Sequence, residues 1–349
     1  MISTFVADLE GMETVLLDDQ SFLDAISSDP DSDGPRLVYA DFLSENGDPD
    51  SLTRAEFIRV QCALEVMKPV DASKLLQQRE AELLASNWRL WLRPLCQSLG
   101  EPLPAIASGS SAQYAIRWFV TEDRPRHVIE QARTRAEPPY LHSCQFRRGF
   151  LAHVALVSKP YRSSSHVARL WERLPLDGLS LIGYSSAEFA TTLSKIDVGR
   201  LRYLEIGNTS DETVSAVAEN RQLSELRELA LHDIHGDMDV CQILGGSTTI
   251  RALRSLILVE CNIHYSGLMK LLQAEFTKHL ERLALVRCNL SDEAAIQLAR
   301  EFPIDRRILH LDLSQNPIAQ RGERSLRQRF GDALRTLPSD HRWPVRYSR

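Results

Sequence analysis

The C-terminal half of the chain contains the segment Ile308-Leu309-His310-Leu311-Asp312-Leu313-Ser314-Gln315-Asn316-Pro317-Ile318. Its apolar residues follow the spacing L-x-x-L-x-L-x-x-(N/C)-x-L. Two further copies have cysteine at the ninth position: Leu253, Leu256, Leu258, Cys261, Ile263 and Leu280, Leu283, Leu285, Cys288, Leu290. Weaker copies begin at Leu226, Leu201, Leu176 and Leu151. The same short unit is therefore repeated seven times.

The units begin at positions 151, 176, 201, 226, 253, 280 and 308, which lie 25, 25, 25, 27, 27 and 28 residues apart. A period in this range is the signature of a leucine-rich-repeat solenoid. We therefore predict an α/β fold with a parallel concave sheet and a helical convex side. The unit length and the helical returns resemble the cysteine-containing and ribonuclease-inhibitor-like subclasses of these repeats. No unit can bury its own apolar face, so stacking supplies the core.

Each unit is expected to begin as a strand whose leucines alternate inward. The Asn or Cys at the ninth position marks the turn out of the strand, where Asn can bond the backbone and Cys acts as a small buried residue. Two units depart from this pattern, with Thr209 and Ile234 at the ninth position. Either their turns are irregular, or Asn208 and Asp233 one residue earlier provide the cap.

Composition is that of an ordinary folded protein, with 349 residues, 43% of them hydrophobic and 25% charged. This length allows two or three domains. We find no apolar run long enough for a membrane span and no secretory signal at the N-terminus. The six cysteines form no CxxC pair, so we expect reduced, buried thiols and a cytoplasmic protein.

Charge is unevenly distributed along the chain. Residues 1–50 carry 13 acidic residues against one arginine, a net charge of −12, and the remainder carries +6, which gives −6 in all. An intramolecular contact between the acidic N-terminus and an arginine-rich part of the repeats is expected from this asymmetry. Nucleic-acid binding would need a basic domain, and the sequence has none.

Residues 1–99 are predicted to form a helical N-terminal domain. Helices are expected over 19–28, from Gly34-Pro35 to Glu45 with a left-handed stop at Asn46-Gly47, over 51–67, and over 71–92, where Pro94 interrupts. The third helix places Leu52, Ala55, Ile58, Cys62 and Val66 on one stripe. Trp88 and Trp91 are expected in a core or at a docking contact.

Within this domain, residues 18–66 contain a specific motif. It reads Arg36-Leu37-Val38-Tyr39-Ala40-Asp41-Phe42-Leu43, then Gly47-Asp48-Pro49, then Arg54-Ala55-Glu56-Phe57-Ile58-Arg59-Val60-Gln61. It resembles the repeat-companion domain at the N-termini of planctomycete-type bacterial leucine-rich-repeat proteins, with Phe42 where that family usually has Trp. The later Phe146-Arg147-Arg148-Gly149-Phe150 resembles the entry to their repeats. The resemblance implies this domain layout and no established activity.

The polar residues of the motif allow two interpretations. Arg36 and Arg59 could pair with Asp41 and Glu56 and lock the short helices together. The other interpretation, to which we give less weight, treats them together with Gln61 as a recognition surface for a partner.

Three further segments complete the predicted organisation. Residues 100–112 are rich in Gly, Pro and Ser and are expected to form a linker. Residues 113–149 are expected to cap the first edge of the solenoid, with a strand over 114–120 and a helix over 125–135. Residues 150–318 hold the repeats, and 319–349 form a C-terminal cap or tail.

A search for catalytic or metal-binding motifs leads to no enzyme, cofactor or metal. Tyr184 stands where a phosphate-binding loop needs Lys, and Gly183-Tyr184-Ser185-Ser186-Ala187 is one residue short of a nucleophile elbow. The stretch from His232 to Asp239 holds two His and three Asp, which we interpret as an exposed polar loop rather than a metal site. His142-Ser143-Cys144 is a weaker candidate.

The residues between the inward leucines are expected to point outward along the concave face. They form an apolar strip of Ile257, Val259, Ala284 and Val286 with charged residues around it, as in protein interfaces. The predicted partner-binding set is Tyr203, Glu205, Glu228, His232, Ile257, Val259, Glu260, Arg282, Val286, Arg287 and Asp312. Two alternatives are that the tail covers the strip and that the residues reflect strand propensity alone.

The predicted function is a non-catalytic scaffold or adaptor that binds a protein partner on the concave face, and neither nucleic acid nor membrane. The alternative is a regulatory or protease-target subunit of a bacterial signalling or defence pathway, cleaved within residues 100–112.

Overall fold

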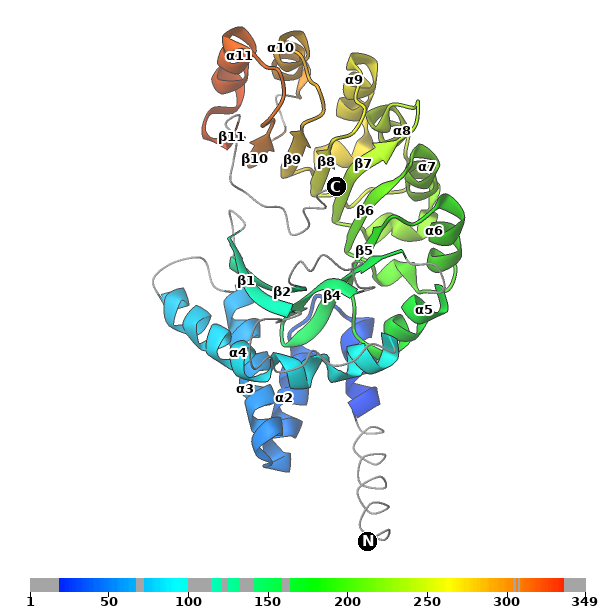
Figure 1. Cartoon of the computed structure of the whole chain (residues 1–349). Helices are drawn as coiled ribbons and strands as arrows, with labels where there is room; N and C mark the ends of the chain where they lie inside the picture. The colour runs from blue at the N-terminus through cyan, green and yellow to red at the C-terminus, as the bar shows by residue number, and fades with distance from the viewer. Residues whose placement is uncertain are drawn as a thin grey trace. The chain divides into compact units, whose positions relative to one another are not determined.

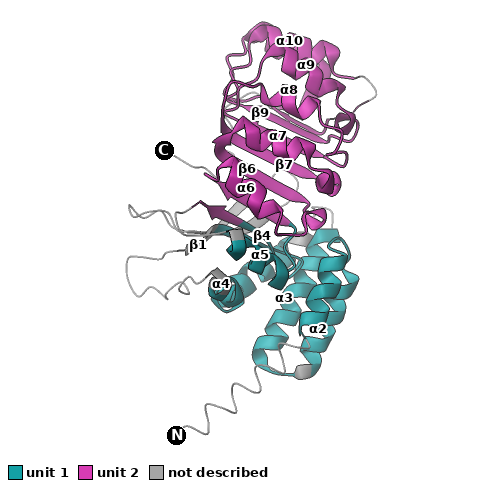
Figure 2. Ribbon diagram, turned by 90° about the vertical axis from the view of Figure 1, so that its right-hand side faces the viewer, with its two compact units in different colours: residues 1–138, 142–154, 165–177 teal, residues 139–141, 155–164, 178–349 magenta. Residues whose placement is uncertain are grey.

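The computed structural model describes residues 19–66, 72–99, 114–120, 125–131, 141–158, 164–303, 306 and 308–335 (Figure 1). The chain divides into two compact units (Figure 2). Unit 1 comprises Met1–Pro138, His142–Val154 and Ser165–Asp177, and unit 2 comprises Pro139–Leu141, Ala155–Ser164 and Gly178–Arg349. The predictions for the linker at 100–112 and for the tail beyond residue 335 lie outside the described residues.

Unit 1 begins with the predicted helices. Residues 19–28 are helical, followed by α2 (Gly34–Asn46), α3 (Pro49–Val66) and α4 (Ala72–Leu99). Helix α2 has Pro in its first turn and stops at Gly47, whose φ of 73° is left-handed. The side chain of Asp48 accepts hydrogen bonds of 3.0 Å from the backbone N–H groups of Asp50 and Ser51, and so caps the start of α3.

Two details of these helices differ from the prediction. The stripe on α3 is buried at Ala55, Ile58 and Cys62, but its ends, Leu52 and Val66, are exposed. Helix α4 continues through Pro94 to Leu99. Proline removes one helical hydrogen bond, and burial of Leu92 and Leu95 on either side of it holds the helix together.

The first core of unit 1 joins these helices to Phe150, the first residue of strand β4 (Phe150–Val157). It contains Ile26, Tyr39, Ala40, Leu43, Ala55, Ile58, Cys62 and Phe150. Phe42 fills the expected packing position, with its ring centroid 4.9 Å from that of Phe22. Trp88 and Trp91 on α4 are buried, as expected.

The strands β1 (Tyr114–Val120), β2 (Pro125–Gln131), β3 (Leu141–Arg147) and β4 (Phe150–Val157) follow. β1 pairs antiparallel with β2 along its whole length, and β2 pairs antiparallel with β3. The helix predicted over 125–135 is therefore wrong. Adjacent β-branched residues, Val128 and Ile129, favour a strand, and pairing with β1 satisfies its backbone. Helix α5 (Ser164–Arg173) comes after β4.

Unit 2 contains a parallel sheet in chain order. Its strands are β5 (Gly178–Ile182), β6 (Tyr203–Ser210), β7 (Glu228–His235), β8 (Ser255–Val259), β9 (Arg282–Val286), β10 (His310–Asp312) and β11 (Leu334–Arg335). The inward leucines of the repeat are buried, with 0–1% of their surface exposed from Leu204 to Leu285. The parallel strands and their register agree with the predicted repeat.

The strands of unit 2 are connected by short helices along one side of the sheet (Figure 1). These are α6 (Ser186–Leu193), α7 (Asp211–Glu219), α8 (Val240–Gly245), α9 (Tyr265–Gln273), α10 (Asp292–Glu301) and α11 (Gln320–Phe330). Short 3₁₀ turns follow several of them: η1 (Val198–Arg200), η2 (Arg221–Glu225), η3 (Glu275–Lys278) and η4 (Gly331–Ala333). Helix α11 and strand β11 extend the alternation of helix and strand past residue 318, into the segment expected to be a cap.

The turn after each strand has one fixed backbone conformation at the eighth position of the unit. The φ angles there are positive, between 51° and 69°, at Gly183, Asn208, Asp233, Glu260, Arg287 and Gln315. The turns at Asn208 and Asp233 therefore match the others, and the expectation that they could be irregular is wrong. This left-handed conformation is sterically strained for residues other than glycine. Because five non-glycine residues adopt it at the same position, we infer that the geometry of the repeat requires it.

The ninth side chain of four units donates a hydrogen bond to a carbonyl of the preceding unit. Cys261 and Cys288 donate to Leu231 and Leu258, and Asn316 donates to Leu285 over 2.6 Å. Thr209 does the same toward Tyr184, also over 2.6 Å. Thr209 is thus the capping residue of its unit, and neither Asn nor Cys is needed. The described cysteines, Cys62, Cys144, Cys241, Cys261 and Cys288, are buried and form no disulfide, as expected.

A second contact between repeats lies where the connecting helices begin. Asp211, Asp239 and Asp292 accept hydrogen bonds of 2.9, 2.7 and 3.0 Å from the backbone N–H groups of Met238, His264 and Ala319 in the following repeat. Each carboxylate occupies space that a Cβ on a glycine of that repeat would enter. A Cβ on Gly236, Gly267 or Gly322 would lie only 2.2, 2.1 or 2.4 Å from a carboxylate oxygen. We call these three pairs the aspartate–glycine latches.

No helix in the described part of the chain is both long and apolar enough to cross a membrane.

Candidate functional site on the open face of the sheet

The face of the unit 2 sheet turned away from the connecting helices, here called the open face, carries the predicted binding residues. Register pairing aligns them in rows across the strands. The first row is Tyr203, Glu228, Ser255, Arg282 and His310. The second is Ser180, Glu205, Ala230, Ile257, Ala284 and Asp312, and the third is Ile182, Gly207, His232, Val259 and Val286. Glu260 and Arg287 lie at the left-handed turn position next to the third row.

A polar cluster occupies the β5–β7 end of this face. The carboxylate of Glu205 accepts hydrogen bonds from the hydroxyl groups of Ser180 and of Tyr203, the latter at 3.2 Å. Nε2 of His232 lies 3.3 Å from Oε1 of Glu205. Ser180 and Glu205 are buried, at 0% and 4% exposure. Burying a carboxylate costs free energy unless hydrogen-bond donors or an opposite charge lie beside it, and these groups fill that role for Glu205.

Gly207 shapes this cluster because it lacks a side chain. A Cβ at this position would lie 1.8 Å from the imidazole ring of His232. His232 therefore lies over Gly207 and reaches Glu205. Ser180 was missed as a site residue, although the fifth position of the unit beginning at Leu176 identifies it by the same rule.

The order of groups in this cluster differs from that of a catalytic triad. In a triad the histidine lies between the nucleophile and the acid, so that it can take the proton of the nucleophile. Here the carboxylate of Glu205 lies between Ser180 and His232. The geometry is that of a fixed carboxylate with hydrogen-bond donors around it.

An apolar cluster follows over β7–β9. It consists of Ala230, Ile257, Ala284 and Val286, with Val259 packed against it, and we call it the apolar strip. The first four are only 1–7% exposed. The sequence suggested a strip open to solvent at a protein interface, and the observed strip is nearly closed to solvent.

A charged ladder runs along the turns beside the strip. The guanidinium of Arg287 makes an ion pair with Glu260, and its Nε donates to Oε1 of Gln315 over 2.8 Å. The side chains of Glu260 and Arg287 are 38% and 54% exposed, so the pair is accessible to solvent. Part of the expected charged rim is therefore organised by interactions between successive repeats.

The His- and Asp-rich loop from His232 to Asp239 does not converge on one point. His232 lies against Glu205, whereas His235 contacts Oδ1 of Asn208 at 3.1 Å. Oδ1 of Asp239 accepts hydrogen bonds from the backbone of Cys241 and Gln242 at the start of α8. Within the described residues, the structure brings no three metal-ligating side chains together. In the other candidate, Ser143 and Cys144 are buried in β3.

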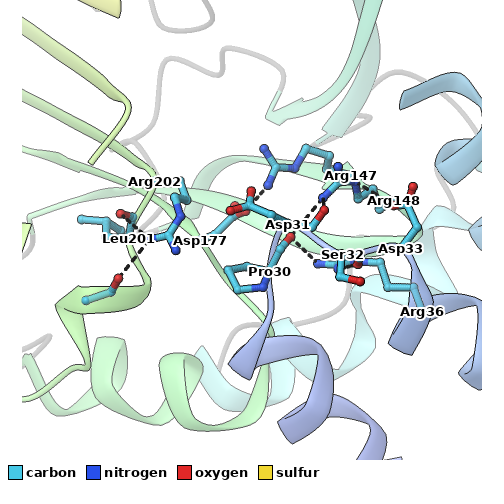
Figure 3. A network of polar contacts seen from close by, with 11 residues as sticks. Pro30, Asp31, Ser32, Asp33, Arg36, Arg147, Arg148, Asp177, Leu201 and Arg202 are labelled. Carbon is cyan, nitrogen blue, oxygen red and sulfur yellow. Dashed lines mark hydrogen bonds and ion pairs between the residues drawn. The ribbon is translucent and has the colours of Figure 1, made fainter. Parts of the chain in front are cut away.

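A second constellation of polar residues lies in unit 1, around the turn between β3 and β4 (Figure 3). Arg36 donates hydrogen bonds to the carbonyl groups of Ser32 and Pro30. Arg148, in the turn, donates to the carbonyls of Pro30 and Asp31 over 3.1 and 2.6 Å. Burial first, and then the charges of Arg148 and Arg147, lower the pKa of Arg36.

Gln61 of the N-terminal motif binds the same turn. Its Oε1 accepts a hydrogen bond of 2.6 Å from the backbone N–H of Gly149, and its Nε2 donates to Glu80 over 2.7 Å. Gly149 has a φ of 85°, and a Cβ there would lie 2.3 Å from Ile58. The turn thus requires glycine for both conformation and space.

Arg54 lies among aromatic rings in the same region. Its guanidinium carbon is 4.9, 5.4 and 5.5 Å from the ring centroids of Trp91, Phe150 and Phe146. Burial lowers the pKa of Arg54 to about 10. Stacking of a cation on ring faces offsets part of the cost of burying it. Residues of the N-terminal motif and of Phe146–Phe150 therefore form one packed structure.

The predicted ion pairs of the motif are correct in one case only. Arg59 pairs with Asp41 at 2.7 Å, as expected. Glu56 instead pairs with Arg79 on α4, through two hydrogen bonds of 2.7 and 2.8 Å. Arg36 binds backbone carbonyls, because the chain turn at residues 30–32 presents them to it. Asp33 lies 3.0 Å from Arg148, but Arg148 precedes the repeats, so the expected contact of the acidic N-terminus with the repeats stays a prediction.

Comparison with known proteins agrees with the repeat. The family model described as Leucine Rich repeat matches residues 278–299, which include β9 and most of α10. The match supports a leucine-rich-repeat protein. No curated protein matches the chain. Leucine-rich repeats commonly mediate protein–protein interaction.

Proposed function

We propose that this chain is a non-catalytic scaffold or adaptor that binds a protein partner through the open face of its repeats. In this proposal the repeats of residues 150–318 form a solenoid, the open face is its concave surface, and residues 1–99 form a separate helical domain. The observation that carries the proposal is one arrangement on a single sheet face. There an apolar strip lies between the Glu205 cluster and the Glu260–Arg287–Gln315 ladder.

Several properties favour a protein partner over a small molecule or a nucleic acid. Strands β5 to β10 span about 24 Å at the usual strand spacing, a length suited to a peptide segment or a protein surface. The face has Glu205, Glu228, Glu260 and Asp312 against Arg282 and Arg287, which does not suit a polyanion. An apolar centre with polar and charged neighbours is the common anatomy of protein interfaces.

The buried cysteines without disulfides also fit this proposal, because a protein in the reducing cytoplasm keeps its thiols reduced. We therefore propose a cytoplasmic adaptor. The alternative of a protease-target subunit depends on residues 100–112, which lie outside the described residues, and it stays a prediction.

The proposal is tested with one variant on the open face and one control. Val259, half-buried beside the strip, is replaced by Arg, and exposed Met238 outside the strip is replaced by Arg as the control. Partners of the wild-type chain are identified by affinity purification from its own host, purified, and titrated against all three proteins. Circular dichroism and a melting curve first establish that both variants fold.

We expect Val259→Arg to weaken binding by about 2 kcal/mol or more, as for a charge placed in an interface core, and Met238→Arg to leave it unchanged. Equal binding by wild type and folded Val259→Arg would overturn the proposal that the open face is the interface.

A further inference from the structure

Two stretches of chain form a cavity in the last described repeats, where α11, β10 and β11 lie (Figure 1). Its volume is about 410 Å³, within the range of about 300–1,000 Å³ that is typical of ligand pockets. One stretch precedes β10, and the other comprises the end of α11 and the turn η4. The described residues that line the cavity include none from the rows of the open face, so it is a second candidate site within unit 2.

The two arginines that line the cavity are held in place by the backbone around them. Nη1 of Arg306 donates a hydrogen bond to the carbonyl of Leu272 over 3.1 Å and another to the hydroxyl of Thr277. Nη2 of Arg329 donates to the carbonyl of Phe302 over 3.2 Å. An arginine has five N–H donors, so these contacts orient both guanidinium groups and leave further donors for a ligand.

Neither arginine is neutralised by a carboxylate of the described chain. Arg306 and Arg329 form no ion pair with any described residue, and their other terminal nitrogens make no hydrogen bond with one. The hydrogen bond from Lys278 lowers the pKa of Glu275, and the charge of Arg306 contributes least to this shift. Glu275 already pairs with Lys278 at 2.6 Å. Two fixed guanidinium groups in one cavity therefore keep their positive charge available.

Apolar side chains form the rest of the cavity lining. Leu309 is 42% exposed, whereas Ile308 beside it in the chain is buried. The ring of Phe330 packs edge-to-face on Phe302, with 5.3 Å between the ring centroids. The guanidinium carbon of Arg329 lies 5.5 Å from the centroid of Phe330. A ligand with an aliphatic group beside its charge can cover Leu309 and meet the arginines at the same time.

The charge of the cavity favours a single carboxylate. Two arginines stand against one acidic lining residue, Asp332, which is exposed and forms no ion pair with either of them. Phosphate would meet stronger repulsion from Asp332 and would gain nothing from the apolar lining. A carboxylate balances the excess positive charge, and its planar shape matches the paired N–H groups of a guanidinium.

We propose that this cavity binds a carboxylate carried next to an aliphatic group, with its oxygens on Arg306 and Arg329 and its aliphatic carbons on Leu309. Such a group occurs at the C-terminus of a protein chain that ends in an apolar residue, and also in acidic side chains. The site gives the chain a second point of attachment at the end of its repeats. It does not rest on the proposed binding of a partner by the open face.

The experiment follows the methyl signals of Leu309 by NMR in the full chain, labelled at its leucine methyl groups and assigned through Leu309→Ile. N-acetyl-leucine is the first probe, because it carries a carboxylate beside an isobutyl group, and N-acetyl-leucinamide is its uncharged control. The α-amide of N-acetyl-glutamic acid presents a side-chain carboxylate instead. Inorganic phosphate tests for general binding of anions.

We expect N-acetyl-leucine to shift the Leu309 signals with a dissociation constant on the order of 1 mM, as for a ligand this small. The uncharged amide and phosphate should leave the signals in place at the same concentration. A stronger response to N-acetyl-leucine than to the glutamic acid derivative assigns the carboxylate to a chain end, and the reverse order assigns it to a side chain.

Three variants connect this binding to the charges of the cavity. Arg329→Gln should weaken the binding of N-acetyl-leucine about fivefold or more, because it removes a charge-assisted hydrogen bond. Arg324→Gln, at an exposed position of the same helix, should leave binding unchanged. Asp332→Asn should strengthen binding about threefold, the effect of removing one nearby like charge. Since Asp332 is exposed, this last variant tests the site without disturbing the fold.

No shift of Leu309 with N-acetyl-leucine, or an equal shift with its amide or with phosphate, would overturn the proposal. Weaker binding by Asp332→Asn, in a chain with an unchanged circular dichroism spectrum, would do the same. Because no protein partner is present, Val259→Arg should bind N-acetyl-leucine like the wild type. Failure of this site therefore leaves the proposed function of the open face untouched, and the reverse also holds.

Discussion

Oδ2 of Asp239 lies 2.7 Å from the backbone nitrogen of His264, and so ties the start of one connecting helix to the next repeat. The other oxygen, Oδ1, accepts from Cys241 and Gln242 in the first turn of α8, at 2.8 and 3.2 Å. The carboxylate itself is buried, with Asp239 8% exposed. One carboxylate thus serves as a helix cap and as a link between repeats.

Replacing this carboxylate is expected to destabilise the repeats. Asp239→Ala removes an N-cap, which alone costs about 1–2 kcal/mol, and leaves the N–H of His264 without its acceptor. The free energy of unfolding from urea denaturation measures the loss. Asp237→Ala is the matched control, since Asp237 is exposed in the same loop. Equal effects of the two substitutions would contradict the latch.

The glycine of the same latch gives a second prediction. Gly267→Ala normally favours a helix, but here its Cβ would lie 2.1 Å from Oδ2 of Asp239. We expect a loss of about 1–3 kcal/mol, the range for overpacking. The loss should be smaller when Asp239 is already alanine, and a double-mutant cycle measures this coupling. Additive effects would show that the two positions act independently.

The contact of Gln61 with Gly149 gives a third prediction, for unit 1. Gln61→Leu keeps the approximate volume but leaves the N–H of Gly149 and the carboxylate of Glu80 without this partner in a buried site. We expect a loss of about 2–4 kcal/mol in the free energy of unfolding.

Arg59→Ala is the control for that substitution, because its ion pair with Asp41 is exposed and should contribute less than about 1 kcal/mol. If Gln61→Leu lowered the free energy of unfolding no more than Arg59→Ala does, the hydrogen bond of Gln61 to Gly149 would not stabilise the turn.

The left-handed turns give a fourth prediction, in which one substitution stabilises. Asp233 has a φ of 53°, a conformation that glycine adopts freely and β-branched residues resist. Asp233→Gly should raise the free energy of unfolding by up to about 1 kcal/mol, and Asp233→Val should lower it by about 1–2 kcal/mol. Melting temperatures that rank the two variants in the opposite order would contradict this account of the turn.

The buried thiols give a prediction on pH. Burial raises the pKa of Cys288 from 9.0 to about 12. Between these values the unfolded chain loses the thiol proton and the folded chain keeps it, so stability present below pH 9 is lost as pH rises. The free energy of unfolding should fall by about 1.4 kcal/mol per pH unit for this thiol near pH 10.

Cys288→Ala removes that contribution. The free energy of unfolding, measured by urea denaturation at pH 8 and at pH 10, should therefore differ less between the two pH values in the variant than in the wild type. Cys62, whose pKa burial also raises to about 12, keeps its share of the pH dependence in the variant. An unchanged difference would mean that the Cys288 thiol ionises normally in the folded chain.

The strands of unit 2 could be predicted because the same spacing of apolar residues recurs in each of the successive repeats. The spacing of Leu229 and Leu231, or of Leu283 and Leu285, defines which side chains face inward and hence which rows lie on the open face. The same is true of α2, whose start at Pro35 and stop at Gly47 depend on local chemistry. Local signals of this kind need no knowledge of the rest of the fold.

Contacts between residues far apart in the chain could not be predicted in this way. Nothing near Gln61 shows that its partner is Gly149, 88 residues later. The sequence of β2 contains Val128 and Ile129, which favour a strand only weakly, and the pairing with β1 that completes the strand cannot be read from residues 125–131 alone. The burial of Ile257 was also missed, because spacing identifies the face of a residue but not how closely its neighbours pack around it.

One left-handed residue ends each strand at the same position of the unit, and this keeps the side chains of the open face aligned in rows. Unit length varies from 25 to 28 residues, yet the register of the rows is unbroken from β5 to β10. The extra residues are absorbed among the connecting helices. A substitution in one strand thus changes one side chain of the open face and leaves the rows aligned. Duplication of a whole unit would add one strand and lengthen the sheet by about 4.8 Å without changing the pairing of the existing strands.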